Sequence, residues 1–173
     1  NGCELPVVIN SGSGNQGLTV SVPLIVYAER EHLDKEKLYR ALVISNLTAI
    51  HLKTEIGRLS AFCGAVSAGA ACGAGLAYLK DASEEVMNHT IVNALAITSG
   101  IICDGAKASC AAKIAVSVEA GILGYDMYMN GQQFYGGDGI ISKGIENTIH
   151  NIGVLGSQGM ASTDQEIIKI MCE

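Results

Sequence analysis

The spacing of apolar residues predicts that most of the chain is helical. Between Asp34 and Gly57, apolar or small side chains recur every three or four residues, which is the period of one helix face. These positions are Leu38, Leu42, Ser45, Ala49, Leu52 and Ile56. Asp34 is a good N-cap and Gly57 a good stop signal, so we expect a helix over Lys35–Ile56. Further apolar residues at Val43, Ile44, Leu47 and Ile50 predict that this helix is buried on two sides.

The segment from Leu59 to Leu79 contains no charged residue and consists mainly of Ala, Gly and Ser. A transmembrane helix is one interpretation. It is disfavoured, because small side chains gain little free energy on entering hydrocarbon. The composition favours a central helix that neighbours approach closely, or else an irregular segment broken by glycines. The segment also carries Cys63 and Cys72.

The next stretch predicts two more helices. Asp81-Ala82-Ser83-Glu84 resembles a capping box with Asp81 in the cap position, opening a helix that stops near Gly100. Ser109 is expected to cap an Ala-rich helix over Cys110–Met129, which Asn130-Gly131 ends.

The C-terminal part is less regular. The glycine-rich stretch Gln132–Gly139 has room for a short hairpin, and a helix or loop is expected around Lys143–Leu155. Thr163-Asp164-Gln165-Glu166 is a second capping box, which predicts the last helix. With no internal repeat and no linker, residues 1–173 are expected to form one all-α domain with at most a few short strands.

Composition narrows the function. The chain is 49% apolar with no Trp and 21 glycines, which predicts thin, closely packed elements. A net charge of -6 argues against nucleic acid as a partner, and no basic run indicates a membrane surface. The chain begins Asn1-Gly2-Cys3 without an initiator Met or a signal-peptide pattern, so we expect a piece of a longer polypeptide. Six cysteines without a secretory signal favour metal or catalytic use over disulfides, although each could equally be a small buried residue.

The stretch Ser11–Gly17 follows a strand-like run and matches G-x-G-x-x-G. Glycines let a ligand approach the backbone, and a following helix would direct free N–H groups at an anion. A dinucleotide is one such ligand, but a helix start at Asp34 occupies the place of the required second strand, and Pro23 would kink the first helix. We therefore expect no NAD. A glycine turn without a ligand and a site for a smaller anion, a carboxylate or a phosphate, both remain open.

Three cysteines provide a second candidate site. Cys103 and Cys110 flank a loop that contains Lys107, and their spacing alone is a weak signal for a metal site. If Cys63 converges with them, the three thiols could hold an iron–sulfur cluster and leave one iron open as a Lewis acid. Lys107 could support the charge of substrate or cluster, although such a loop lysine is more often solvated.

Three motifs in order, within Ser11–Gly17, Gly57–Ala65 and Cys103–Cys110, resemble the L-cysteine desulfidase family. That family is related to the α chain of the iron–sulfur L-serine dehydratases. The resemblance implies a mainly helical, cytoplasmic protein with a [4Fe-4S] cluster and no pyridoxal phosphate. It also implies β-elimination from L-cysteine, which yields sulfide, pyruvate and ammonia.

The same resemblance implies roles for individual residues. Cys63, Cys103 and Cys110 match the three cluster ligands, and the glycine stretch matches the loop that receives the substrate carboxylate. The substrate-binding candidates are Ser11, Asn15, Gln16 and Lys107. The general base of the family lies in the N-terminal part of the longer protein, and Cys3 does not occupy its position. We therefore expect residues 1–173 to be inactive alone and to have that N-terminal part as a partner. We also expect that the protein can form a homodimer.

Two alternatives accompany this interpretation. An L-serine dehydratase would eliminate water with the same apparatus, and a helical domain that has lost its cluster would serve only in assembly. Of the other cysteines, Cys72 is predicted to be core. Cys172 matches a tail position that related serine dehydratases can place on the open iron, a role we consider minor here.

Overall fold

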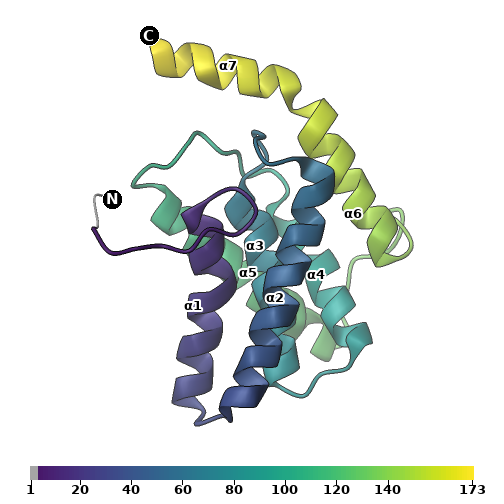
Figure 1. Cartoon of the computed structure of the whole chain (residues 1–173). Coiled ribbons are helices and arrows are strands. Elements are labelled where there is room, and N and C mark those ends of the chain that lie inside the picture. The colour runs from purple at the N-terminus through teal and green to yellow at the C-terminus, as the bar shows by residue number, and fades with distance from the viewer. Residues whose placement is uncertain (1–3) are drawn as a thin grey trace.

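A computed structural model describes residues 4–173 (Figure 1). The regular structure in this part of the chain is helical, as predicted, and none of it is a β-strand. The elements are α1 (Gly14–Arg30), α2 (Lys35–Ile56), α3 (Gly64–Leu79), α4 (Glu84–Thr98), α5 (Cys110–Met129), α6 (Ile145–Val154), the π-helical turn η1 (Leu155–Gly159) and α7 (Ala161–Cys172). Because α1 leads to α2 and not to a second strand, Ser11–Gly17 does not open a βαβ unit.

Helix α3 is the centre of the bundle and packs against α1, α2, α4 and α5. Residues 65–77 are all buried, which only small side chains allow when four helices approach. Gly73 faces Gly121 of α5 so closely that a Cβ at Gly73 would lie 2.9 Å from the Gly121 Cα. The uncharged segment is therefore the central helix that its composition favours. None of the helices in residues 4–173 combines the length and apolar character needed to cross a membrane.

Helix α2 has the predicted bounds. The Asp34 carboxylate accepts hydrogen bonds from the N–H groups of Glu36 (2.8 Å) and Lys37 (3.4 Å), and Gly57 ends the helix with φ +90°. Of the predicted face, Ser45, Ala49, Leu52 and Ile56 are buried, whereas Leu38 and Leu42 are partly buried against a hydrophobic cluster.

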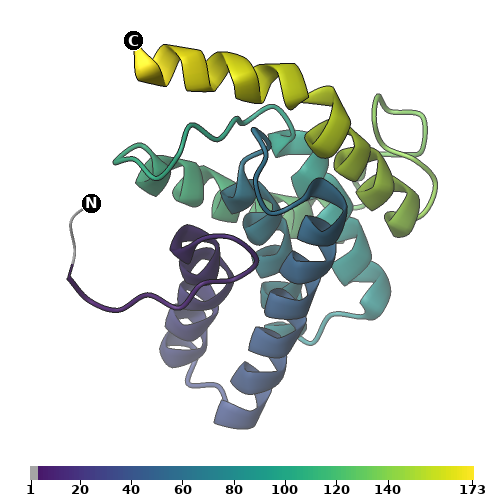
Figure 2. The same cartoon turned by 45° about the horizontal axis from the view of Figure 1, so that its top comes forward.

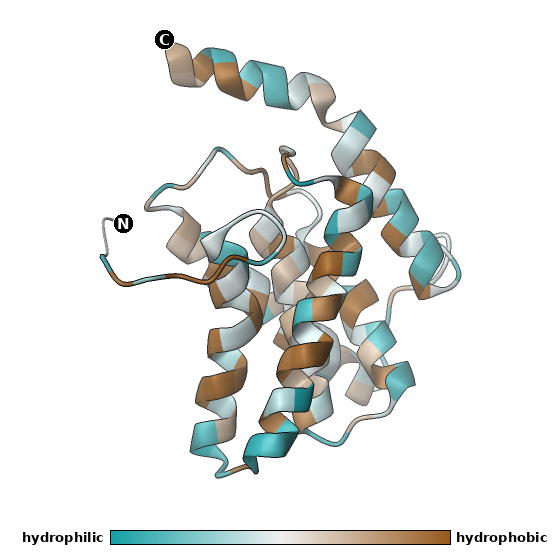
Figure 3. Ribbon diagram, in the orientation of Figure 1, coloured by the Kyte–Doolittle hydropathy of each residue, from teal (hydrophilic) through white to brown (hydrophobic). Residues whose placement is uncertain are grey.

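The prediction that α2 is buried on two sides is wrong. Val43, Leu47 and Ile50 are 47–60% exposed, because α2 lies at the edge of the bundle. Helix α1 exposes Leu18, Val22 and Val26, and Figure 3 shows brown segments on both ribbons. We call these six residues the aliphatic face.

Two capping predictions are also wrong, and a third is right in position only. Ser83 caps α4 through the Val86 N–H, because Asp81 lies in the left-handed region at φ +59° and pairs with Lys37. Ser109 is the N-cap residue of α5, as predicted, but it has helical backbone angles and its side chain makes no capping hydrogen bond. Helix α7 begins at Ala161, so the second predicted box lies inside it.

Two further predictions concern Pro23 and the hairpin. Helix α1 runs without interruption from Gly14 to Arg30, although it contains Pro23. Residues 132–139 contain no strand pair and belong to an irregular connection between α5 and α6. The region predicted as helix or loop after it is α6. In both Figure 1 and Figure 2, α7 carries the C-terminus to the end of the bundle where the N-terminal segment lies.

Candidate functional site

An isolated antiparallel bridge between Phe62 and Ile102 brings two of the three cysteines together. The Cys103 N–H donates to the Ala61 carbonyl (2.7 Å), and the Cys63 N–H donates to the Ile101 carbonyl (3.2 Å). Cys63 and Cys103 each follow a bridged residue, so their side chains lie on the same face of the bridge. The two thiols share a hydrogen bond.

The third cysteine is positioned by the loop between Cys103 and α5. The Lys113 ammonium donates to the Asp104 carboxylate (2.6 Å) and to the Ile102 carbonyl (2.9 Å), which ties the loop to the helix. The Cys110 thiol donates to the Gly105 carbonyl (3.3 Å). Its sulfur accepts from the backbone N–H of Lys107 (3.4 Å).

The glycine-rich stretch forms a tight turn into α1. Ser11 adopts a positive φ of +57°, and the Ser13 hydroxyl accepts from the Gln16 N–H (3.3 Å) and from its side-chain amide (3.2 Å). Gln16 is 4% exposed and packs against Gly64, where a Cβ would lie 2.5 Å from Gln16 Nε2. The Gln16 Oε1 is buried and has no hydrogen-bond partner among the described residues.

A cavity of about 270 Å³ joins these segments. Of the predicted site residues, the structure places Asn15, Gln16, Cys63, Cys103 and Cys110 in its lining. The other two predicted residues do not line it. Ser11 lines an adjoining outer cavity, and Lys107 reaches the site only through its backbone.

Three helices begin at this cavity. The first residues of α1 and α5 are Gly14 and Cys110, and Cys63 is the N-cap of α3. The N-termini of α3 and α5 have no side-chain cap. In α5 the first N–H groups donate to carbonyls of the preceding turn, for example Cys110 to Lys107 (3.0 Å). The positive ends of three helix dipoles still favour negative charge here, whether thiolate or bound anion.

Lys53 is a site residue that the sequence interpretation missed. It is 5% exposed, lines both the cysteine cavity and the outer cavity, and forms no ion pair within residues 4–173. Burial lowers the pKa of its ammonium, and the nearby Cys103 and Cys63 act in the opposite direction. Its sequence signal is its register: Lys53 follows Ala49 by one helical turn on the buried stripe of α2. Lys113 was missed as well, although it lies three residues after Cys110 on one helix face.

The thiols are not equivalent. The hydrogen bond from Cys63 lowers the pKa of Cys103 below its ordinary 9.0, whereas that bond and burial raise the pKa of Cys63. Burial alone raises the pKa of Cys72 to about 12. Cys72 packs in a separate hydrophobic cluster with Leu24 and Leu76, as predicted for a core residue.

The donor set fits an iron–sulfur cluster better than a single ion. Within the described residues, no three His, Cys, Asp or Glu side chains are placed to hold one metal ion. A cluster is larger than a single ion, and Cys63, Cys103 and Cys110 all line the same cavity. Thiolates are the ligands that iron–sulfur clusters prefer, and the positive helix ends would offset the cluster's negative charge.

Other polar and thiol side chains lie outside the cysteine cavity or at its rim. Arg58 is exposed at the rim, while Glu55 pairs with His150 (3.5 Å). The Asn151 side chain donates to the Ile140 carbonyl, so it stabilises a loop and does not serve a ligand. Cys172 is exposed on α7, next to Met171, which lies 3.7 Å from where a Gly105 Cβ would be. Cys3 lies outside the described residues.

The comparison with known families rests on nearly the whole chain. The family model described as serine dehydratase alpha chain matches residues 1–169. The chain belongs to this family. No solved structure matches it.

Relatives within the family are longer than this chain. A UPF0597 protein of Desulfitobacterium hafniense is 67% identical over 170 residues, which is 98% of this chain and 40% of the relative. UPF0597 proteins of Lachnoclostridium phytofermentans and Treponema denticola are 56% and 55% identical, over 41% and 39% of their lengths. The chain thus spans about 40% of the length of the relatives it matches.

Proposed function

We propose that the chain carries the cluster-binding part of a carbon–sulfur lyase that eliminates sulfide from L-cysteine. The observation that supports this most strongly is the convergence of Cys63, Cys103 and Cys110 with the N-terminus of α1 on one cavity. An amino acid with a thiol leaving group needs an anion site for its carboxylate and a soft metal for its sulfur. This cavity offers residues suited to both.

Cys63, Cys103 and Cys110 would hold a [4Fe-4S] cluster in this proposal. When bound, a cluster with three protein ligands supplies an iron with a free position, a Lewis acid suited to a departing thiolate. The membership in the serine dehydratase alpha chain family supports this assignment.

The chain's own residues would bind and orient the substrate. The N–H groups of Gly14 and Asn15 lie in the first turn of α1, where they have no intrahelical acceptor, and they would donate to the carboxylate. The buried Lys53 ammonium, which lines the same cavity, would add a charge-assisted bond. The orphaned Gln16 Oε1 would accept a hydrogen bond from the substrate ammonium.

The reaction balances with water as the only co-reactant. Removal of the α-proton and departure of sulfide leave aminoacrylate, which tautomerises to an imine. Hydrolysis of the imine gives pyruvate and ammonia. We assign the base that takes the α-proton to the remaining 60% of the longer polypeptide, which this chain does not include.

We further propose that the rest of the polypeptide covers the aliphatic face. The six aliphatic side chains are 40–60% exposed and lie on two helices that contact each other. The relatives contain more than half of their length outside the matched region, enough for at least one further domain.

Free thiols at a cluster site also suit the reducing cytoplasm, where we place the protein.

Elimination of water from L-serine is the second candidate, because the matching family model is described as serine dehydratase alpha chain. The discriminating experiment uses the longer protein, purified anaerobically, with L-cysteine and L-serine offered separately. We expect sulfide and pyruvate in equal amounts from cysteine, and a much lower kcat/KM with serine. Pyruvate from serine at the higher kcat/KM would replace our assignment with the dehydratase. Residues 1–173 alone should release no sulfide.

A further inference from the structure

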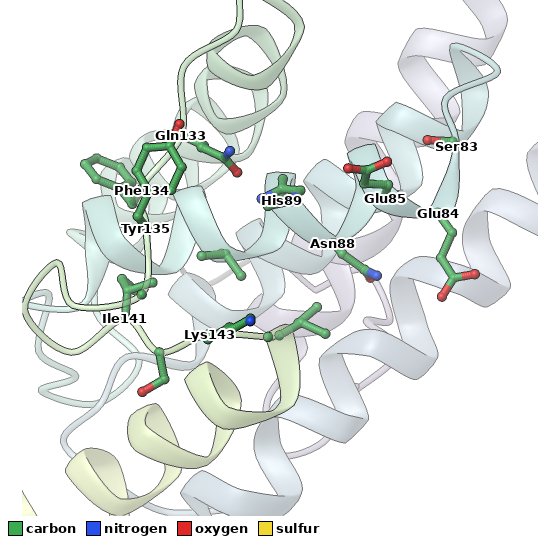
Figure 4. A pocket seen from close by; sticks show the side chains of 15 residues that line it. Ser83, Glu84, Glu85, Asn88, His89, Gln133, Phe134, Tyr135, Ile141 and Lys143 are labelled. Atoms are coloured by element: carbon green, nitrogen blue, oxygen red, sulfur yellow. The ribbon is translucent and has the colours of Figure 1, made fainter.

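A second cavity, of about 740 Å³, shares no lining residue with the cysteine cavity. It lies between the first turns of α4 and the connection from α5 to α6, as Figure 4 shows. Its volume falls within the range of small-molecule sites. The proposed reaction uses none of its residues.

The connection over residues 130–144 has no regular structure, yet buried polar side chains fix its path. Asn93 is fully buried, accepts from the Phe134 N–H (3.1 Å) and donates to the Gly124 carbonyl (3.0 Å). The buried Thr148 hydroxyl bonds to the N–H (3.2 Å) and carbonyl (3.1 Å) of Ser142. Irregular connections of this length usually serve a function. One fixed in this way forms its cavity in advance, which lowers the cost of ordering on binding.

The cavity combines an apolar base with unused polar groups. Val92 and Ile141 are buried at the base. The side chains of Asn88, Gln133 and Lys143 make no hydrogen bond to any other described residue. In Figure 4, Gln133 lies on one side of the cavity and Lys143 on the other. A ligand with an apolar body and polar acceptor atoms matches this lining.

The available charge points to an anion. Lys143 forms no ion pair within residues 4–173 and directly precedes the N-terminus of α6, where the N-cap Gly144 offers no side-chain bond. The free N–H groups of this first turn reinforce the lysine, and Glu146 in the same turn pairs with His51 (2.9 Å). Of the two acidic residues in the lining, Glu85 already accepts from the Tyr128 hydroxyl (2.9 Å). Glu84 is directed outward in Figure 4.

We infer that this cavity is a second ligand site, for a small organic carboxylate that carries an apolar group. The carboxylate binds Lys143 and the first turn of α6, and the apolar group packs on Val92 and Ile141. Asn88 and Gln133 bond to the polar atoms that remain. The inference stands independently of the proposed lyase activity, because it involves no cysteine and no cluster.

The test is a titration of the protein with 3-phenylpropanoate, followed through the methyl NMR signals of Val92, Ile141 and Ile145. Two probes dissect the recognition: 3-phenylpropan-1-ol lacks the charge, and acetate lacks the apolar body. We expect the carboxylate to shift the methyl signals of these three residues. It should bind about tenfold more tightly than the alcohol, as a charge-assisted bond predicts, and more tightly than acetate, which buries little apolar surface. Absence of shifts would overturn the inference, and so would equal binding of the alcohol.

Three lysine variants distinguish binding at this site from nonspecific attraction to surface charge. Lys143→Met should weaken 3-phenylpropanoate binding about tenfold without changing the binding of the alcohol. Lys143→Gln should have the same effect while keeping a polar side chain. Lys35→Met removes another exposed lysine, outside this cavity, and should change nothing. Equal losses in the Lys35 and Lys143 variants would show nonspecific attraction and overturn the assignment, as would unchanged binding in the Lys143 variants.

Discussion

The backbone N–H of Cys103 donates to the carbonyl of Ala61 at 2.7 Å, and this bond places Cys103 beside Cys63. The two cysteines are far apart in the sequence, and the bridge that brings them together lies outside the helices. The chemistry of the candidate site therefore depends on a short irregular contact that the central helix α3 fixes at one end. Several predictions about stability and reactivity depend on this arrangement and on the packing of α3.

Close packing of α3 on α5 makes Gly69 irreplaceable. A Cβ at Gly69 would overlap the Ser117 carbonyl of α5. Gly69→Ala should therefore lower the free energy of unfolding by about 2 kcal/mol despite the better helix propensity of alanine. Gly100→Ala is the control, because no heavy atom lies within 4 Å of its Cβ position. Chemical denaturation of both variants measures the difference, and equal stabilities would contradict the packing described here.

The shared hydrogen bond predicts unequal thiol reactivity in the cluster-free protein. Because Cys63 donates to it, Cys103 should form a thiolate at a pH below the ordinary thiol value of 9.0. The rate of iodoacetamide labelling at Cys103, followed by peptide mass spectrometry, should rise to half its maximum below that pH. In Cys63→Ala the midpoint should move upward. Cys72, with a pKa of about 12, should remain unlabelled until the protein unfolds. A midpoint for Cys103 that is indifferent to Cys63 would contradict the pairing.

Lys53 should destabilise the folded protein and at the same time contribute to substrate binding. Its pKa in the folded protein lies below the ordinary 10.5, so the unfolded chain binds the proton more tightly. The free energy of unfolding should consequently rise as pH increases from the lowered value toward 10.5. Lys53→Met should flatten that part of the profile and stabilise the cluster-free fold. In the longer protein it should raise KM for L-cysteine about tenfold, as loss of a charge-assisted bond predicts. Lys35→Met serves as control, and a wild-type KM in Lys53→Met would exclude Lys53 from substrate binding.

The aliphatic face predicts different responses in the short and the long chain. Leu47→Lys should leave the stability of residues 1–173 within about 0.5 kcal/mol, because Leu47 is 60% exposed. In the longer protein the same change should lower the melting temperature, since it would bury a charge under the remaining polypeptide. Ile168→Lys on α7, which is 61% exposed, is the matched control. Equal melting temperatures of the longer protein with and without Leu47→Lys would show that nothing covers this face.

The sequence predicts those features of the fold that depend on interactions between residues close together in the chain. The bounds of α2 follow from Asp34, Gly57 and the period between them, all of which act within one helix. The burial of Val43 and Leu47 was mispredicted, because periodicity identifies an apolar face but not what packs on it. The cap of α4 was misplaced from Ser83 to Asp81, since both residue types suit that position and only the backbone angles decide.

The same distinction holds for the site. The glycine spacing and the three cysteines identify the segments that line the cavity. These residue types alone indicate a tight turn and potential metal ligands. Lys53 was missed, since a lysine in a helix is ordinarily solvated and only the bundle reveals its burial. The Phe62–Ile102 bridge leaves no periodic pattern, so the sequence could suggest that the cysteines converge but not how.

The most direct test of the central claim is the iron and sulfide content of the protein after anaerobic reconstitution, measured with its visible absorption. We predict a brown protein with four irons and four sulfides, as a [4Fe-4S] cluster requires. Cys63→Ala, Cys103→Ala and Cys110→Ala should each lose the cluster, whereas Cys72→Ala should keep it. A colourless wild-type protein would contradict the account and favour a role in assembly alone, and a cluster that survives in any of the three ligand variants would contradict the ligand assignment.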